Sequence, residues 1–107
     1  MKKIYFTLTG TKHYHGKEFL EPGMKVNLIK EPDNEYDKEA IRVEVKGNLK
    51  VGYVANSPYT VVGDSCCAGR IYDKIGHSAS GTILYVLPEG VQCILDKKSL
   101  KKGKKQK

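Results

Sequence analysis

The fold is decided by residues 41–54, IRVEVKGNLKVGYV. In residues 41–45 apolar side chains alternate with charged ones, the pattern of a β-strand that buries one face. Residues 46–48, Lys-Gly-Asn, favour a turn, and residues 51–54 then form a returning strand, so the stretch predicts an antiparallel hairpin. Gly52 inside that second strand indicates a bulge or the close approach of another backbone or a ligand, or else it meets only a packing need.

Short strand patterns continue on both sides of this hairpin. They occupy residues 4–8, 24–28, 82–86 and 91–95. The last two are joined by a turn at residues 88–90, Pro-Glu-Gly. Residues 57–58, Ser-Pro, are a good helix start, with Gly63 interrupting that helix. A second helical stretch, residues 68–75, ends at Gly76. Six short strands with one or two short helices predict a mainly β chain, built as a small barrel or barrel-like sheet.

The positive charge of the chain is concentrated at its C-terminal end. Residues 97–107 hold seven lysines and no acidic residue, and the 12 basic residues that remain of the 19 equal the 12 acidic ones. At 107 residues the chain fits a single domain. We therefore expect one domain over residues 1–96 and a disordered, lysine-rich tail over residues 97–107. Such a tail either solubilises the protein or contacts polyanions without sequence preference.

The sequence carries no recognisable membrane or secretion signal. No apolar run approaches the roughly 20 residues of a membrane-spanning helix, and the N-terminal residues lack the hydrophobic core of a signal peptide. Three cysteines, Cys66, Cys67 and Cys93, fit neither a disulfide framework nor a zinc spacing, and are most simply small buried apolar residues. These features predict a soluble cytoplasmic protein without a membrane partner.

An acidic segment, EPDNEYDKEAI at residues 31–41, leads into the hairpin. It has five carboxylates at alternate positions, as a calcium-binding loop would. Lys38 occupies the place where such a loop needs glycine, so the match is partial. The segment also fits a surface turn in which Pro32 ends the strand, Asp33 and Asn34 bond to their own backbone, and Asp37 caps the entry to the next strand. A surface turn does not explain Tyr36, an aromatic residue between acids.

A basic and aromatic segment follows the first strand. Lys12, His13 and Tyr14 together present one cation and two stacking faces. A second histidine lies two residues after His13, as in some zinc sites, but no third ligand accompanies the pair. Two serine motifs, at residues 63–65 and 76–78, lack the rest of a hydrolase signature. The sequence therefore predicts no catalytic residue, no resident metal and no cofactor.

Taken together, these segments resemble the HIRAN domain family. The resemblance rests on Gly10 after the first strand, the basic and aromatic segment, Gly23 before the second strand, the run at residues 31–41 and the Val-Gly-Tyr-Val of residues 51–54. It covers about residues 4–95. It implies a small six-stranded barrel of the modified OB-fold or SH3-like type with one or two short helices. HIRAN domains occur in bacteria, and fused to fork-remodelling helicases.

In the helicase members, the family has a pocket for the free 3′ end of single-stranded DNA. By position, Tyr36 corresponds to one of two aromatic side chains that hold the last base, and Asp37 to the acceptor of the terminal 3′-hydroxyl. Asn34 corresponds to a polar contact in the same loop. His13 stands where those domains have a tyrosine, and Lys12 where they have an arginine. The resemblance thus implies an end-binding site in this chain.

The acidic segment fits this role better than it fits general phosphate binding. Five carboxylates repel backbone phosphates, and they favour a site where the strand ends and only a hydroxyl arrives. Tyr53 replaces a histidine of the family on the opposite face. The candidate nucleic-acid-binding residues are Lys12, His13, Tyr14, Asn34, Tyr36, Asp37 and Tyr53.

Three functions are compatible with the sequence. The first is a non-catalytic module of DNA repair that recognises single-stranded DNA by its 3′-hydroxyl end and serves a helicase or nuclease in trans. The second is a protein-interaction or regulatory barrel that kept the fold without the pocket. The third is a metal-dependent hydrolase that uses the acidic segment, although no base or nucleophile accompanies its carboxylates. The sequence leaves open whether the ligand is DNA or RNA, and which oligomeric state the protein adopts.

Overall fold

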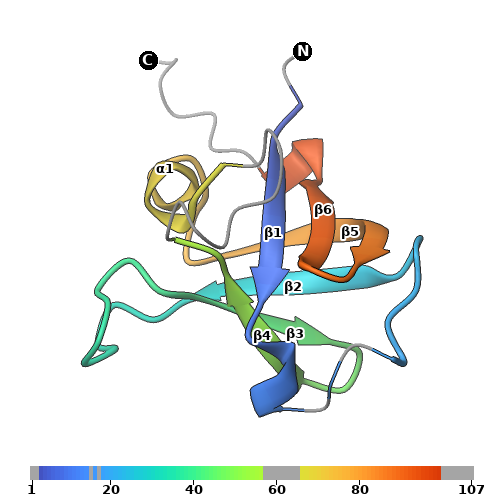
Figure 1. The fold of residues 1–107 in the computed structure, drawn as a ribbon. Helices are drawn as coiled ribbons and strands as arrows, with labels where there is room; N and C mark the ends of the chain where they lie inside the picture. The colour runs from blue at the N-terminus through green and yellow to red at the C-terminus, as the bar shows by residue number, and fades with distance from the viewer. Residues whose placement is uncertain (1–2, 15, 17, 57–65, 100–107) are drawn as a thin grey trace.

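The computed structural model describes residues 3–14, 16, 18–56 and 66–99, and Figure 1 shows their arrangement. This part of the chain is mainly β, as predicted. Its strands are β1 (Tyr5–Thr9), β2 (Lys25–Lys30), β3 (Ile41–Val45), β4 (Leu49–Val54), β5 (Ser78–Leu87) and β6 (Gly90–Leu95). Its helices are the 3₁₀ helix η1 (Thr11–His13), the α-helix α1 (Ala68–Tyr72) and the 3₁₀ helix η2 (Lys97–Ser99). None of the described helices is long and apolar enough to cross a membrane.

The strands form a closed antiparallel barrel in the order β1-β4-β3-β2-β5-β6, with β6 returning to β1. The small six-stranded barrel expected from the sequence is therefore confirmed. Both predicted hairpins are present, β3 with β4 and β5 with β6. Short turns between antiparallel strands keep neighbours in the sequence adjacent in the sheet, which is why the hairpins could be predicted from local patterns.

Inward-facing apolar side chains from the alternating strands fill the barrel. Inward-facing residues that are fully buried include Phe6, Leu8, Leu28, Val43 and Ile83. Strand β5 begins at Ser78, four residues earlier than the pattern predicted, because its first residues pair with β2 from Ser78 opposite Ile29 onward. Those first residues are small and polar, so they carry no hydrophobic alternation.

Gly52 combines both special roles that a glycine can take within a strand. The register between β3 and β4 shifts there, since Val43 lies opposite Gly52 but Glu44 lies opposite Lys50. A Cβ atom on Gly52 would overlap the carbonyl oxygen of Thr9 and lie 2.8 Å from Leu8 Cδ1. The glycine therefore allows β1 to approach β4 closely enough to close the barrel.

The helical prediction holds in part. Helix α1 ends at Tyr72, three residues before the predicted end, although the hydrophobic spacing continues and Ile71 and Ile75 are both fully buried. Hydrophobic burial continues beyond the end of the helix because packing depends on where a side chain points and not on helical hydrogen bonds. The helix start predicted at residues 57–58 and the interruption at Gly63 lie outside the described residues.

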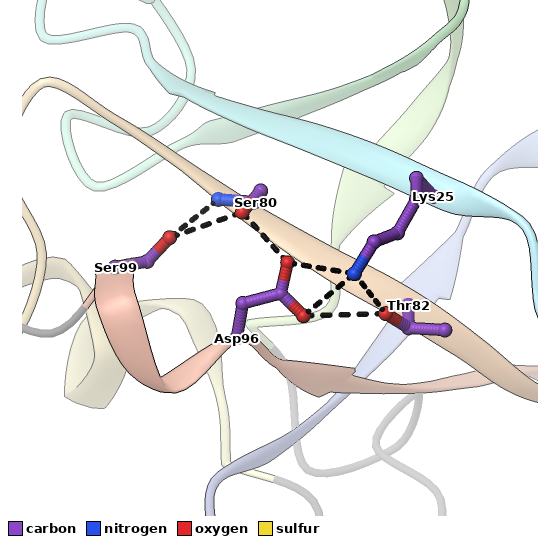
Figure 2. A network of polar contacts seen from close by, with 5 residues as sticks. All are labelled: Lys25, Ser80, Thr82, Asp96 and Ser99. Atoms are coloured by element: carbon purple, nitrogen blue, oxygen red, sulfur yellow. Dashed lines mark hydrogen bonds and ion pairs between the residues drawn. The ribbon is translucent and has the colours of Figure 1, made fainter.

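The C-terminal end of the described chain is fixed by a polar network, shown in Figure 2. Lys25 Nζ lies 3.0 Å from Asp96 Oδ2 and donates to Thr82 Oγ1 at 2.9 Å. Ser80 Oγ donates to Asp96 Oδ2 at 2.7 Å, while the Ser80 amide donates to Ser99 Oγ at 2.8 Å. Burial acts to raise the pKa of Asp96, but hydrogen bonds from Ser80, Lys25 and Thr82 outweigh it and lower the pKa.

Regular structure thus continues to Ser99, three residues beyond the domain boundary expected at residue 96. The reason is that η2 folds back and bonds to β5 through Ser99, a contact between residues 19 apart that no local pattern reveals. The rest of the expected tail, residues 100–107, lies outside the described part of the chain.

Candidate nucleic-acid interface

The β2–β3 loop, residues 31–40, projects from the strands of the barrel (Figure 1). Residues of this loop line a pocket of about 570 Å³. Three tyrosines, three polar residues and two small apolar residues line it: Tyr14, Tyr36 and Tyr53, then Asn34, Asp37 and Asn56, and finally Ala40 and Val54. These residues come from the segment after η1, the β2–β3 loop and the end of β4. The pocket is large enough for a small organic ligand.

Asn34 determines the shape of the β2–β3 loop. Its Nδ2 donates to Glu31 Oε1 at 3.0 Å, and its Oδ1 accepts the amides of Tyr36 at 2.8 Å and Asp37 at 3.0 Å. A side chain that bonds to its own following backbone in this way forms a tight turn. The turn leaves the ring of Tyr36 at the pocket edge, with 89% of the residue exposed.

Asp37 is held rigidly within the same loop. Its Oδ1 accepts the amide of Glu39 at 2.9 Å, and its Oδ2 accepts Asn56 Nδ2 at 2.9 Å. Asn56 is itself fixed, because its Oδ1 accepts the amide of Gly69 in α1 at 2.8 Å. A carboxylate oxygen can accept more than one hydrogen bond, so Asp37 still has acceptor capacity towards the pocket.

The wall opposite the loop is built around the hydroxyl of Tyr53. This hydroxyl donates to Glu31 Oε1 at 2.8 Å and accepts a hydrogen bond from Lys50 Nζ at 2.7 Å. The rings of Tyr14 and Tyr53 lie 6.4 Å apart at a tilt of 49°. Glu31 also accepts from Arg42 NH1 at 2.8 Å, so one carboxylate connects the loop, the wall and β3.

The network shifts the pKa values of its members in opposite directions. Burial acts to raise the pKa of Glu31, but hydrogen bonds from Asn34, Tyr53 and Arg42 outweigh it and lower the pKa. Burial also acts to lower the pKa of Lys50, yet its hydrogen bonds to the two tyrosines raise the pKa. For Tyr53, burial and the Glu31 carboxylate raise the pKa against the opposing effect of Lys50. At neutral pH the site therefore holds one carboxylate, one ammonium and one neutral phenol in contact.

Five of the seven candidate residues line this one pocket: Tyr14, Asn34, Tyr36, Asp37 and Tyr53. Lys12 does not. It lines a separate hollow with Gly10 and Glu18, between the end of β1 and the β5–β6 turn. Successive residues of a 3₁₀ helix point about 120° apart, so side chains two positions apart around η1 diverge. His13 is the last residue of η1, and its side chain lies outside the described part of the structure.

The site also contains residues that the sequence did not single out, namely Lys50, Asn56 and Glu31 in its connecting role. Lys50 and Tyr53 are three positions apart, which would place them on opposite faces of a regular strand. The bulge in β4 brings them to the same face, where they bond. A glycine within an alternating strand was the one local signal of that bulge.

The described residues contain no cluster of side chains suited to holding a metal ion. Within residues 3–14, 16, 18–56 and 66–99, no three His, Cys, Asp or Glu side chains converge on a point that a metal ion could occupy. Cys93 is fully buried, as predicted, and burial raises the pKa of its thiol to about 12. Cys66 is partly buried and packs against the core, whereas Cys67 is only partly buried, so the prediction holds in full for Cys93 alone of the three.

Comparison with known proteins gives the same family as the sequence motifs. A model of the HIRAN domain matches residues 1–63. A crystal structure of a protein from Lactobacillus plantarum matches with a TM-score of 0.60 and 24% identity, covering 88% of this chain and 93% of that one. The HIRAN domain of human HLTF matches with a TM-score of 0.57 and 17% identity, covering 87% of this chain and 74% of that one.

The sequence has no significant match among curated proteins. At such low identity, the two structural matches establish the fold alone. The family match is independent of them and includes the β2–β3 loop and β4, which line the pocket. Because the HIRAN model covers more than half of the sequence, and because the barrel has the fold of a solved HIRAN domain, the chain belongs to the HIRAN domain family.

Proposed function

We propose that this protein is a non-catalytic module that binds the 3′-hydroxyl end of single-stranded DNA. Membership of the HIRAN family supports a nucleic-acid-binding module. The observation that carries the more specific proposal is the pairing of an exposed ring with a fixed hydroxyl acceptor: Tyr36 and Asp37 are adjacent, line one pocket, and are held by the same asparagine.

Tyr36 is suited to stacking on a base. A tyrosine that is 89% exposed contributes little to the stability of the barrel, and its ring stands at the edge of a pocket with two further tyrosines. Stacking of a base on such a ring contributes about 1–3 kcal/mol and does not depend strongly on which base is present. Sequence-tolerant binding is what recognition of a strand end requires.

Asp37 is suited to accepting the terminal hydroxyl. Two donors from the protein already fix its carboxylate, so a further donor from a ligand meets a group in a defined position. A phosphate at this point is disfavoured because the loop carries further carboxylates at Asp33, Glu35 and Glu39. The site should therefore distinguish a strand that ends in a hydroxyl from one that continues or ends in phosphate.

In this proposal the barrel carries the specific site, and the lysine-rich segment that follows adds attraction for any polyanion. Three free cysteines suit a reducing cytoplasm. The module would then mark a DNA end for a helicase or nuclease acting in trans during repair.

The test is a fluorescence titration of the full chain against single strands that end in 3′-hydroxyl or 3′-phosphate, and against a blunt duplex. We expect the hydroxyl end to bind about tenfold more tightly, the size of one charge-assisted hydrogen bond. Asp37→Asn should remove this preference, and Tyr36→Ala should weaken binding about tenfold.

Two matched variants control for surface effects. Tyr85→Ala removes an exposed tyrosine from β5, away from the pocket, and Asp73→Asn removes an exposed carboxyl just after α1, outside the acidic loop. Both should leave the end preference unchanged. Equal affinity for all three nucleic acids would overturn the proposal and favour a protein-interaction barrel in its place.

A further inference from the structure

Lys50 is a cation that lies against two tyrosines of the pocket, although it does not itself line the pocket. Its Nζ lies 4.8 Å from the centre of the Tyr14 ring and 4.5 Å from that of Tyr53, both of which line the pocket. An ammonium over aromatic faces is attracted by the ring electrons while its charge stays intact. The bulge in β4 places it there, as described above.

The groups in direct contact with Lys50 are neutral, and its ammonium interacts with the Glu31 carboxylate only across the Tyr53 hydroxyl. The Tyr53 hydroxyl has one hydrogen, which it gives to Glu31, so towards Lys50 it acts only as an acceptor. Among the described residues, no carboxylate lies within 4 Å of Lys50 Nζ. Its hydrogen bonds to tyrosine raise its pKa, so the group is an ammonium at neutral pH.

The neighbouring cations differ from Lys50 in this respect. Arg42 lies between two carboxylates, with NH1 2.8 Å from Glu31 Oε2 and Nε 2.8 Å from Glu44 Oε2. Lys12, which stands where the helicase members have an arginine, lines the separate hollow together with Glu18. Among the described residues, Lys50 is thus a cation that makes no direct ion pair and lies against two tyrosines of the pocket.

We infer that Lys50 binds the phosphate that joins the last two nucleotides of the bound strand. This inference rests on the proposed function, since the phosphate is placed by a terminal nucleoside lying between Tyr36 and Asp37. An ammonium has three donors, and its hydrogen bonds to Tyr53 and Tyr14 leave one of them for a phosphate oxygen without leaving the tyrosine rings. The acidic loop then receives the hydroxyl, and the opposite wall receives the single phosphate that follows it.

The experiment is a double cycle on the full-length protein, with wild type and Lys50→Met against two strands. One strand has natural phosphodiesters, and the other has a neutral methylphosphonate at the last linkage. We expect the methylphosphonate to weaken wild type about fivefold, and Lys50→Met to weaken binding of the natural strand about fivefold. Lys50→Met should bind the modified strand with the same affinity as it binds the natural strand, because the mutation has already removed the contact with that phosphate.

Salt dependence gives a second readout that a purely structural role would not affect. Loss of one phosphate contact should reduce the slope of log K against log salt by about 0.7 for Lys50→Met. Lys50→Arg keeps the charge and should keep both the slope and the sensitivity to methylphosphonate. Lys12→Met should behave as wild type.

Two outcomes would overturn the assignment. In the first, Lys50→Met binds the methylphosphonate strand about fivefold more weakly than the natural strand, so that the effects of the mutation and of the modification multiply. In the second, Lys50→Met binds the natural strand as tightly as wild type does. Failure of the proposed function appears separately, because the same wild-type protein is titrated against a 3′-phosphate strand. If wild type still prefers the hydroxyl end but the two losses of affinity multiply, only the role of Lys50 is disproved. If wild type shows no preference for the hydroxyl end, the end-binding function itself is disproved.

Discussion

At the scale of single residues, the site depends most on Glu31. Its two carboxylate oxygens accept hydrogen bonds from Asn34 in the loop, Tyr53 in the wall and Arg42 in β3. Asn34 in turn holds the backbone of Tyr36, so the position of the exposed ring depends on a carboxylate five residues away. Glu31 is therefore a positioning residue, which connects the two sides of the pocket without lining it.

Substitution of this residue should change how stability depends on pH. The pKa of Glu31 is lower in the folded chain than its ordinary value of 4.5, so its ionised form stabilises the fold at higher pH. This contribution is complete above the ordinary pKa and is lost as pH falls through the lower folded pKa. Glu31→Gln should therefore be less stable at pH 7, by about 1–2 kcal/mol, and the difference should shrink towards pH 3.

Urea unfolding at pH 7, 5 and 3 measures this effect. Glu35→Gln, an exposed carboxyl in the same loop, is the matched control and should follow wild type at every pH. A Glu31→Gln deficit that stays constant from pH 7 to pH 3 would contradict the argument, because it would mean that the ionised carboxylate is not the stabilising form.

Five of the seven candidate residues that were predicted from the sequence line one pocket. The sequence motifs could not predict the contacts between them. Asn34, Tyr36 and Asp37 are neighbours in sequence, so the loop that holds them was visible as a motif. Lys50 and Asn56 were not visible, because their contacts depend on strand register and on α1. Such contacts are fixed only when the barrel closes.

At the scale of elements, β4 does the most to shape the site. Tyr53 of this strand lines the pocket, and the bulge places Lys50 on the same face of the strand as Tyr53. Gly52 leaves room for the close approach of β1. The strand positions themselves were predictable, since a period of two residues with one buried face is a strong local signal. Gly52 was the one sign of the bulge in the sequence. The spacing of residues could not predict that the bulge places Lys50 on the same face as Tyr53.

Gly52→Ala should destabilise the barrel at this junction. The added methyl group would overlap the Thr9 carbonyl oxygen, which belongs to the backbone of β1 and cannot rotate away. We expect a loss of about 1–3 kcal/mol in the free energy of unfolding, as for other overpacked cores, measured by urea denaturation. Gly76→Ala is the matched control, because no atom lies within 4 Å of a Cβ at Gly76, and it should be nearly neutral. Equal stability of the two variants would show that β1 can move away from β4 at little cost.

At the scale of the whole molecule, the two described 3₁₀ helices lie at different ends of the barrel. In Figure 1, η1, which precedes Tyr14 of the pocket, lies at the opposite end of the barrel from η2. The network around Asp96 fixes η2 to β2 and β5 (Figure 2), so the lysine-rich end of the chain starts from a defined place. Under the proposed function, we therefore expect the lysine-rich segment to add affinity without taking part in the choice of ligand.

Deletion of residues 100–107 tests this separation. The deletion removes five lysines but keeps Ser99 and its bonds to Ser80, so the melting temperature should not change. Affinity for single strands should fall, and the slope of log K against log salt should decrease by up to about 0.7 for each lost phosphate contact. The ratio of affinities for 3′-hydroxyl and 3′-phosphate ends should stay the same, because Tyr36 and Asp37 are untouched.

A full-length chain with the same five lysines changed to glutamine separates charge from chain length and should match the deletion in both slope and ratio. If the ratio falls in either variant, the lysine-rich segment takes part in end recognition, and the barrel alone does not hold the specific site.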